Sequence, residues 1–213
     1  MFHAQNDMLR ASKTVLTTNN SERCTRITMT FPTKPASDLH SAETKLAVRS
    51  MLNASLSIEE SDILYLGISV GLGDLFVEVT TSSFQKMCAN QTLNLNALLE
   101  WDGYTRGLIV CCVESTDSPT EREDSAEQTT APLSIDFCSR FFAPKAGIAE
   151  DPVTGSAHCA LAPYFSSKLA KQSVVGRQIS QRGGIVGCEL ADNLSSVKLT
   201  GTATTSMSGI LWL

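Results

Sequence analysis

Residues 140–158 read Arg-Phe-Phe-Ala-Pro-Lys-Ala-Gly-Ile-Ala-Glu-Asp-Pro-Val-Thr-Gly-Ser-Ala-His, and they carry more structural information than any other part of the chain. Apolar residues followed by proline and glycine predict the end of a strand, and the loop after them leads into a helix predicted over 156–171. The first turn of a helix has unpaired N–H groups and the positive end of the peptide dipole, so it can bind a carboxylate or phosphate. The sequence therefore predicts an anion site flanked by Asp151 and Ser156.

Residues 150–158, Glu-Asp-Pro-Val-Thr-Gly-Ser-Ala-His, closely resemble the signature of the phenazine-biosynthesis (PhzF-like) family. The segments at 159–165 and 178–184 resemble the helix and the Ser-x-Arg-Gly-Gly turn that follow in that family. Upstream, 106–111 and 135–141 resemble family strands in the family order. The resemblance covers residues 13–213, and it identifies the chain as an N-terminally shortened member.

The resemblance implies an α+β fold like that of diaminopimelate epimerase. In such a fold each of two similar halves is a curved mixed sheet wrapped around one helix, and the active site lies in the cleft between the halves. Residues 1–36 are then a remnant of a mostly missing first half, and 37–213 form a largely complete second half. The wrapped helix has an apolar face on one side. Its members are Ala157, Ala160, Leu161 and Phe165.

The family's activity implies an isomerase that removes and redelivers a proton on a small carboxylate-bearing metabolite, without a metal or an organic cofactor. By matched positions, Asp151 and Ser156 are the expected catalytic residues, and Thr154, Gly155 and His158 are expected to bind substrate. The family's catalytic glutamate belongs to the part upstream of residue 1, and no residue here matches it. Two simpler interpretations stay open: Asp151 can stabilise an Asp-Pro turn, and Ser156 can be a helix N-cap.

A second class of function is also compatible with the sequence. The chain can be a non-catalytic anion-binding or interaction protein, or an inactive truncated form that lacks the catalytic glutamate. Replacement of Asp151 by Asn separates the classes, because an enzyme loses turnover whereas a binding protein loses affinity only. A serine hydrolase is disfavoured, since Ser156 does not lie in a Gly-x-Ser-x-Gly motif.

Composition predicts a globular cytoplasmic chain with neither nucleic acid nor a membrane as partner, and the family resemblance implies a homodimer. Apolar residues make up 42% and charged residues 18%, and no apolar run is long enough for a membrane helix. The net charge of −5 comes from 114–130, predicted to be an exposed loop, and no basic stripe is present. Seven cysteines without a CxxC motif predict small buried residues rather than disulfides or a metal site, with Cys159 the best candidate for a reactive thiol.

Periodicity and turn residues predict the remaining elements. A helix is expected at 42–52, Gly71-Leu-Gly73 is expected to be a hairpin turn rather than a dinucleotide loop, and 82–85 resembles a capping box. Residues 1–3 resemble the end of a helix, and Pro163 is expected to kink or shorten the helix at 156–171. Strands are expected at 14–18, 26–31, 63–69, 75–80, 107–113, 133–141, 185–190, 197–204 and 208–213.

Overall fold

The computed structural model describes residues 2–4, 7–17, 23–90, 92–104, 106–114, 134–191 and 193–204. The strand predicted at 208–213 and nearly all of the predicted acidic loop at 114–130 lie outside these residues. Within the described ranges no helix is long and apolar enough to cross a membrane.

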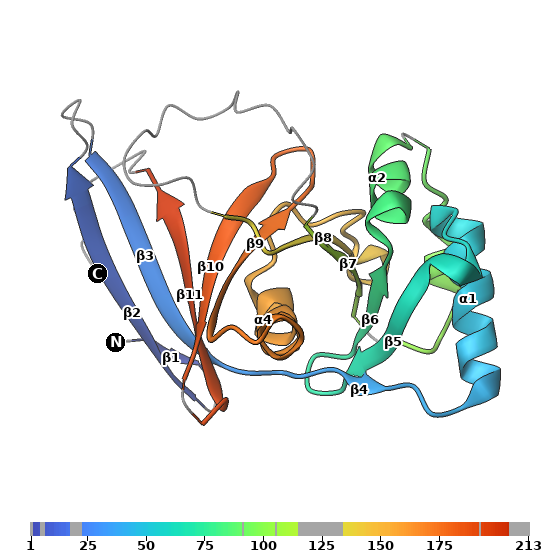
Figure 1. The fold of residues 1–213 in the computed structure, drawn as a ribbon, viewed down its shortest axis with the longest axis horizontal. Helices are drawn as coiled ribbons and strands as arrows, with labels where there is room; N and C mark the ends of the chain where they lie inside the picture. The colour runs from blue at the N-terminus through green and yellow to red at the C-terminus, as the bar shows by residue number, and fades with distance from the viewer. Residues whose placement is uncertain are drawn as a thin grey trace.

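Strands dominate the architecture, and they form one curved sheet of eleven strands in these ranges, in the order β1-β2-β3-β11-β10-β9-β8-β7-β6-β5-β4 (Figure 1). The β6–β7 and β8–β9 pairs are parallel and the others are antiparallel, so the sheet is mixed. The predicted α+β class is therefore confirmed. The strands are β1 Phe2–Ala4, β2 Asp7–Thr17, β3 Arg23–Pro32, β4 Ser37–Asp38, β5 Ile63–Ser69, β6 Asp74–Val79, β7 Leu108–Val113, β8 Phe137–Phe142, β9 Ser173–Gln178, β10 Gly184–Leu190 and β11 Ser196–Ala203.

The helix after the signature segment, α4 (Gly155–Leu169), lies inside the curve of the sheet (Figure 1). The four residues of its predicted apolar face are all at most 1% exposed. Phe165 stacks on Phe137 of β8, with 4.4 Å between ring centroids and 2° between planes. The expected arrangement of a curved sheet around a central helix is confirmed, and it fixes the direction in which the start of α4 points.

Gly176 of β9 lets the sheet approach α4 closely. A Cβ at this position would lie 2.4 Å from Cζ of Phe137, whose ring is held by its stacking partner. Gly176→Ala is therefore expected to lower the free energy of unfolding by about 1–3 kcal/mol, measured by urea denaturation. Gly201→Ala in β11 is the matched control, because a Cβ there meets nothing within 4 Å. Equal stability of the two variants would contradict this account of the packing.

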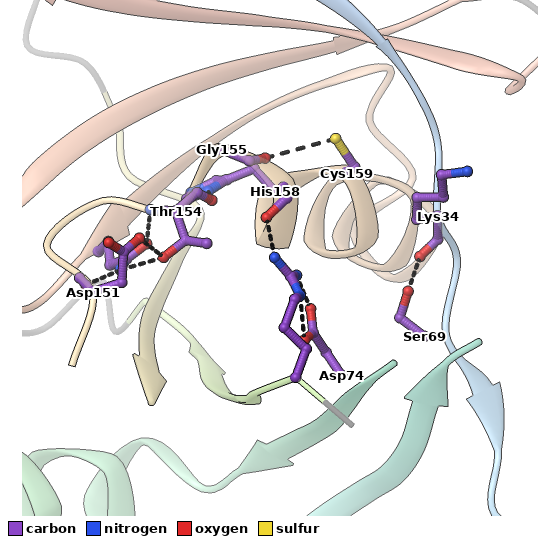
Figure 2. A network of polar contacts seen from close by, with 11 residues as sticks. Lys34, Ser69, Asp74, Asp151, Thr154, Gly155, His158 and Cys159 are labelled. Atoms are coloured by element: carbon purple, nitrogen blue, oxygen red, sulfur yellow. Dashed lines mark hydrogen bonds and ion pairs between the residues drawn. The ribbon is translucent and has the colours of Figure 1, made fainter. Parts of the chain in front are cut away.

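Pro163 does not end α4: the helix continues to Leu169, two residues before the end predicted at 171. Proline has no N–H, which leaves the carbonyl of Cys159, four residues earlier, without its helical donor. The backbone N–H of Lys34 donates to this carbonyl at 2.8 Å, and the Lys34 carbonyl accepts a hydrogen bond from Ser69 Oγ at 2.8 Å (Figure 2). The segment after β3 therefore satisfies the helix backbone.

The other helices are α1 (Ala42–Leu56), α2 (Thr81–Ala89) and α3 (Asn96–Glu100), with 3-10 turns at Glu60–Asp62 and Pro144–Ala146. α1 begins at the predicted residue and ends four residues later than predicted. The predicted capping box is wrong, because Thr80 and not Ser82 is the N-cap of α2: Thr80 has extended backbone angles and its Oγ1 accepts from Ser83 N–H at 3.3 Å.

Three further elements differ from the sequence prediction. Residues 2–4 form β1, paired antiparallel with β2, so the expected helix end is wrong. The strand β9 and the short helix α3 were not predicted. A glycine near the middle of a strand weakens its local preference, and β9 is instead stabilised by pairing with β8 and β10 on its two sides.

One face of β3 carries Ile27, Met29 and Phe31, and this face extends beyond α4. Ile27 and Phe31 are half-buried, and Met29 is 41% exposed. On the opposite face, Thr28 and Thr200 share a hydrogen bond of 2.9 Å between their hydroxyl groups. The apolar face is thus only partly covered by the described residues.

Candidate functional site

The start of α4 is built around Thr154, its N-cap, which has φ −102° and ψ 96°. The Thr154 hydroxyl does not cap the helix; it donates to Oδ2 of Asp151 at 2.5 Å (Figure 2). Ser156 is the second residue of the helix, so its interpretation as an N-cap is wrong. No side chain in the described part of the chain caps the first turn, so within that part the N–H groups of Gly155 and Ser156 are left for water or a ligand.

The loop before α4 is fixed by the side-chain amide of Gln178, which is 1% exposed at the end of β9. Its Oε1 accepts from Thr154 N–H at 2.7 Å. Its Nε2 donates to the Asp151 carbonyl at 2.6 Å and to Thr154 Oγ1 at 3.1 Å. Of the donors and acceptors of the Gln178 side-chain amide, all but one take part in these hydrogen bonds to the loop. Asp151 and Thr154 are thus held in one arrangement, which also supports the loop-stabilising interpretation of Asp151.

A buried ion pair lies on the other side of Ser156. Asp74, at the start of β6, is fully buried and accepts from Nε of Arg106 at 2.8 Å and also from its Nη2. Nη1 of Arg106 donates to Ser156 Oγ at 2.8 Å. The guanidinium also lies over the Phe141 ring, 5.2 Å from its centroid. Burial raises the pKa of Asp74, and the Arg106 charge opposes that rise.

A pocket of about 460 Å³ lies beside the first turn of α4 and includes Gly155 and Ser156 in its wall. Its volume is in the range of small-molecule sites. Among the described residues of this wall, Lys34 is the one of a charged type. Most of the remaining wall is apolar and comes from β3, β10, β11 and the loop before α4; it includes Ile27, Met29, Phe31, Val153, Val186 and Leu199.

The imidazole of His158 does not reach this pocket. His158 is fully buried, and its Nδ1 lies 2.8 Å from the Thr154 carbonyl, to which it donates. Its Nε2 has no hydrogen-bond partner among the described residues and faces Gly176 of β9. His158 therefore supports the N-cap residue from inside, and its role in substrate binding stays a prediction.

Burial lowers the pKa of His158 below its usual value of 6.5. A depressed pKa means that the contribution of His158 to the free energy of unfolding is complete above pH 6.5. This contribution is lost as the pH falls toward the folded-state pKa, because the unfolded chain binds the proton more readily. We expect the urea midpoint to fall between about pH 7.5 and about pH 5 by more than in His158→Gln, which cannot charge. An equal fall in both proteins would exclude His158 as a cause.

The Cys159 thiol is a poor nucleophile in this setting. It is 4% exposed, and burial raises its pKa to about 11, although the charges of Lys34 and Arg106 lower it in part. A thiol is reactive mainly as a thiolate, so the structure disfavours the predicted reactive cysteine.

The sequence predicted one local segment of the site but not the residues from distant parts of the chain that hold this segment in place. Asp151, Thr154, Gly155 and Ser156 lie together at the start of α4. Three residues went unrecognised as parts of the site: Asp74, Arg106 and Gln178. The sequence features that could have indicated them are the family resemblance of the segments that contain Arg106 and Gln178, and the acidic character of Asp74 at the start of an apolar strand.

Comparison with known proteins gives consistent matches. The sequence signature of the family described as "Phenazine biosynthesis-like protein" matches residues 9–209. A human phenazine biosynthesis-like domain-containing protein is 30% identical over 217 residues, covering 99% of this chain and 68% of that protein. An uncharacterized isomerase of Pseudomonas aeruginosa is 48% identical over 81 residues, covering 38% of this chain and 30% of that protein.

A crystal structure of a PhzF-family phenazine biosynthesis protein from Enterococcus faecalis superimposes with a TM-score of 0.64 at 25% identity. The match covers 94% of this chain and 65% of that one. The chain described here thus spans about two thirds, or less, of the length of these relatives.

Proposed function

Because the chain belongs to the phenazine biosynthesis-like family, we propose that it forms the anion-binding part of an isomerase that acts on a small carboxylate-bearing metabolite. The observation that carries this proposal is the start of α4. There Gly155 and Ser156 lie in the wall of a pocket that Lys34 also lines, and no side chain among the described residues caps the helix. Each of these features favours a bound anion.

In the proposed reaction the substrate carboxylate accepts hydrogen bonds from the N–H groups of Gly155 and Ser156 and from the Ser156 hydroxyl. Removal of a proton from the adjacent carbon moves negative charge onto the carboxylate oxygens. Donors that are already oriented stabilise this developing charge with little reorganisation. The start of α4 therefore lowers the barrier to proton removal without an organic cofactor or a metal.

Asp151 is proposed to orient the substrate or to share in the proton transfer. Its Oδ2 accepts a hydrogen bond from Thr154, and its backbone is anchored by Phe141 and Gln178. A carboxylate held in this way keeps a fixed direction, which is what general acid-base catalysis requires. In this proposal the glutamate implied by the family resemblance remains the group that first removes the proton.

Nuclear magnetic resonance titration of the 15N-labelled protein tests the anion site. We expect phenylacetate to shift the amide resonances of Gly155, Ser156 and Ala157, and phenylacetamide, which has the same shape without the charge, to leave them unchanged. Equal effects of the two compounds, or none, would overturn the proposal. Binding of phenylacetate, together with no proton exchange on small carboxylates in a form of the protein that carries the glutamate implied by the family resemblance, would instead favour a non-catalytic anion-binding protein.

A further inference from the structure

Ser156 accepts a hydrogen bond from Arg106, and this restricts the direction in which its own hydroxyl group can donate one. A guanidinium has donors only, so the 2.8 Å contact between Nη1 and Oγ has the serine oxygen as acceptor. The hydroxyl hydrogen of Ser156 then points elsewhere. Ser156 also lies in the wall of the pocket, so an acceptor bound there is a partner for that hydrogen.

We propose that Arg106 is a positioning residue that orients the Ser156 hydroxyl as a hydrogen-bond donor toward an anionic ligand in the pocket. This inference rests on the proposed function, because it names how one member of that anion site is set. Arg106 acts through Ser156 and has no contact with substrate in this proposal. It predicts that the ligand group at Ser156 is an acceptor such as a carboxylate oxygen.

Asp74 makes this arrangement rigid. Its carboxylate is fully buried and takes Nε and Nη2 of Arg106, which leaves Nη1 directed at Ser156. The Phe141 ring covers the guanidinium, 5.2 Å away. A planar guanidinium presents its donors in a fixed fork, so fixing two of them also fixes the third. The side chain of Arg106 is 34% exposed, so this fixation comes from its partners and not from complete burial.

Lysine cannot replace arginine in this role. Its ammonium is a single point of charge, so it can pair with Asp74 and keep the buried charge neutralised, but it does not present a second, oriented donor to Ser156. Arg106→Lys therefore separates the two functions of Arg106. The variant retains the ion pair needed for folding and loses the orientation of the serine hydroxyl.

The experiment is a double-mutant cycle of Arg106→Lys and Ser156→Ala, read by the dissociation constant of phenylacetate. A charged hydrogen bond contributes enough that each single change is expected to weaken binding about tenfold. If Arg106 acts through Ser156, Arg106→Lys has little further effect in the Ser156→Ala background. Asp74→Asn, which loosens Arg106 without removing it, is expected to follow the same pattern. A merely structural role would weaken binding equally in both backgrounds.

A second measurement needs no ligand. The Hα–Hβ scalar couplings of Ser156 report its χ1 rotamer, which we expect to be single in the wild type and averaged in Arg106→Lys. Unchanged couplings, or phenylacetate affinity unchanged in Arg106→Lys, would overturn the inference. If the wild type does not bind phenylacetate, the proposed anion site is wrong, and the couplings still decide whether Arg106 orients Ser156.

Discussion

Replacement of Arg106 by Met is expected to lower the free energy of unfolding by about 3 kcal/mol, because it leaves the carboxylate of Asp74 buried without its cation. Asp74 is fully buried, and two donors of Arg106 satisfy its two oxygens. Methionine removes the charge together with the guanidinium contact to Phe141. A double variant that also carries Asp74→Asn separates the two effects, because it lacks the guanidinium as well but has no buried charge.

Urea denaturation of the wild type, of Arg106→Met and of Arg106→Met/Asp74→Asn measures this effect. The double variant carries a neutral amide in place of the carboxylate, so it is expected to recover much of the lost stability. Asp102→Asn is the control for removal of a carboxylate, because the Asp102 side chain is fully exposed. A double variant no more stable than Arg106→Met alone would show that the charge of Asp74 is not the cause.

The effect of Arg106→Met also has a defined pH dependence. Burial raises the pKa of Asp74, and removal of the Arg106 charge that opposes this rise raises it further. A carboxyl group whose pKa is raised in the folded state makes its full contribution to the free energy of unfolding below its unfolded-state pKa of 3.8. This contribution is lost as the pH rises through the folded-state pKa. The difference between wild type and Arg106→Met is thus expected to narrow as the pH is lowered toward 4.

The start of α4 was predictable from sequence because its information is local. A strand end, a Pro-Gly break and a helix start follow one another within 140–158, and the apolar positions of the helix repeat with the helical period. The structure confirms α4, its buried face and most strands. Such features depend on neighbours in the chain, so a single sequence displays them directly.

The supports of the site were not predictable in the same way because they come from distant strands. Asp74, Arg106 and Gln178 meet the 151–156 loop only after β6, β7 and β9 have taken their places in the sheet. β9 itself was not predicted, since pairing with its neighbours outweighs its weak local preference. A buried polar residue in a strand is explained by its partner, and the partner is set by sheet order rather than by spacing.

In a longer form of the protein that carries the glutamate implied by the family resemblance, Asp151→Asn is expected to lower the rate of proton exchange on a carboxylate substrate by a factor of about 10² or more. Asparagine has the shape of aspartate, and its side-chain oxygen can still accept the hydrogen bond from Thr154. It carries no negative charge and does not take up a proton near neutral pH. The variant therefore retains the loop and loses the property that acid-base catalysis or charge recognition requires.

Deuterium uptake from heavy water into a panel of small carboxylates, followed by mass spectrometry, measures this rate. Several carboxylates are tested because the proposal specifies only the carboxylate group of the substrate. Thermal unfolding of Asp151→Asn is expected to match the wild type, which separates a catalytic loss from a folding defect.

Equal exchange rates in the two proteins would dismiss Asp151 as a participant and leave the loop-stabilising interaction with Thr154 as its role. Weaker phenylacetate binding in a protein that exchanges no proton would place Asp151 in an anion-binding protein, because a carboxylate can orient a ligand without transferring its proton.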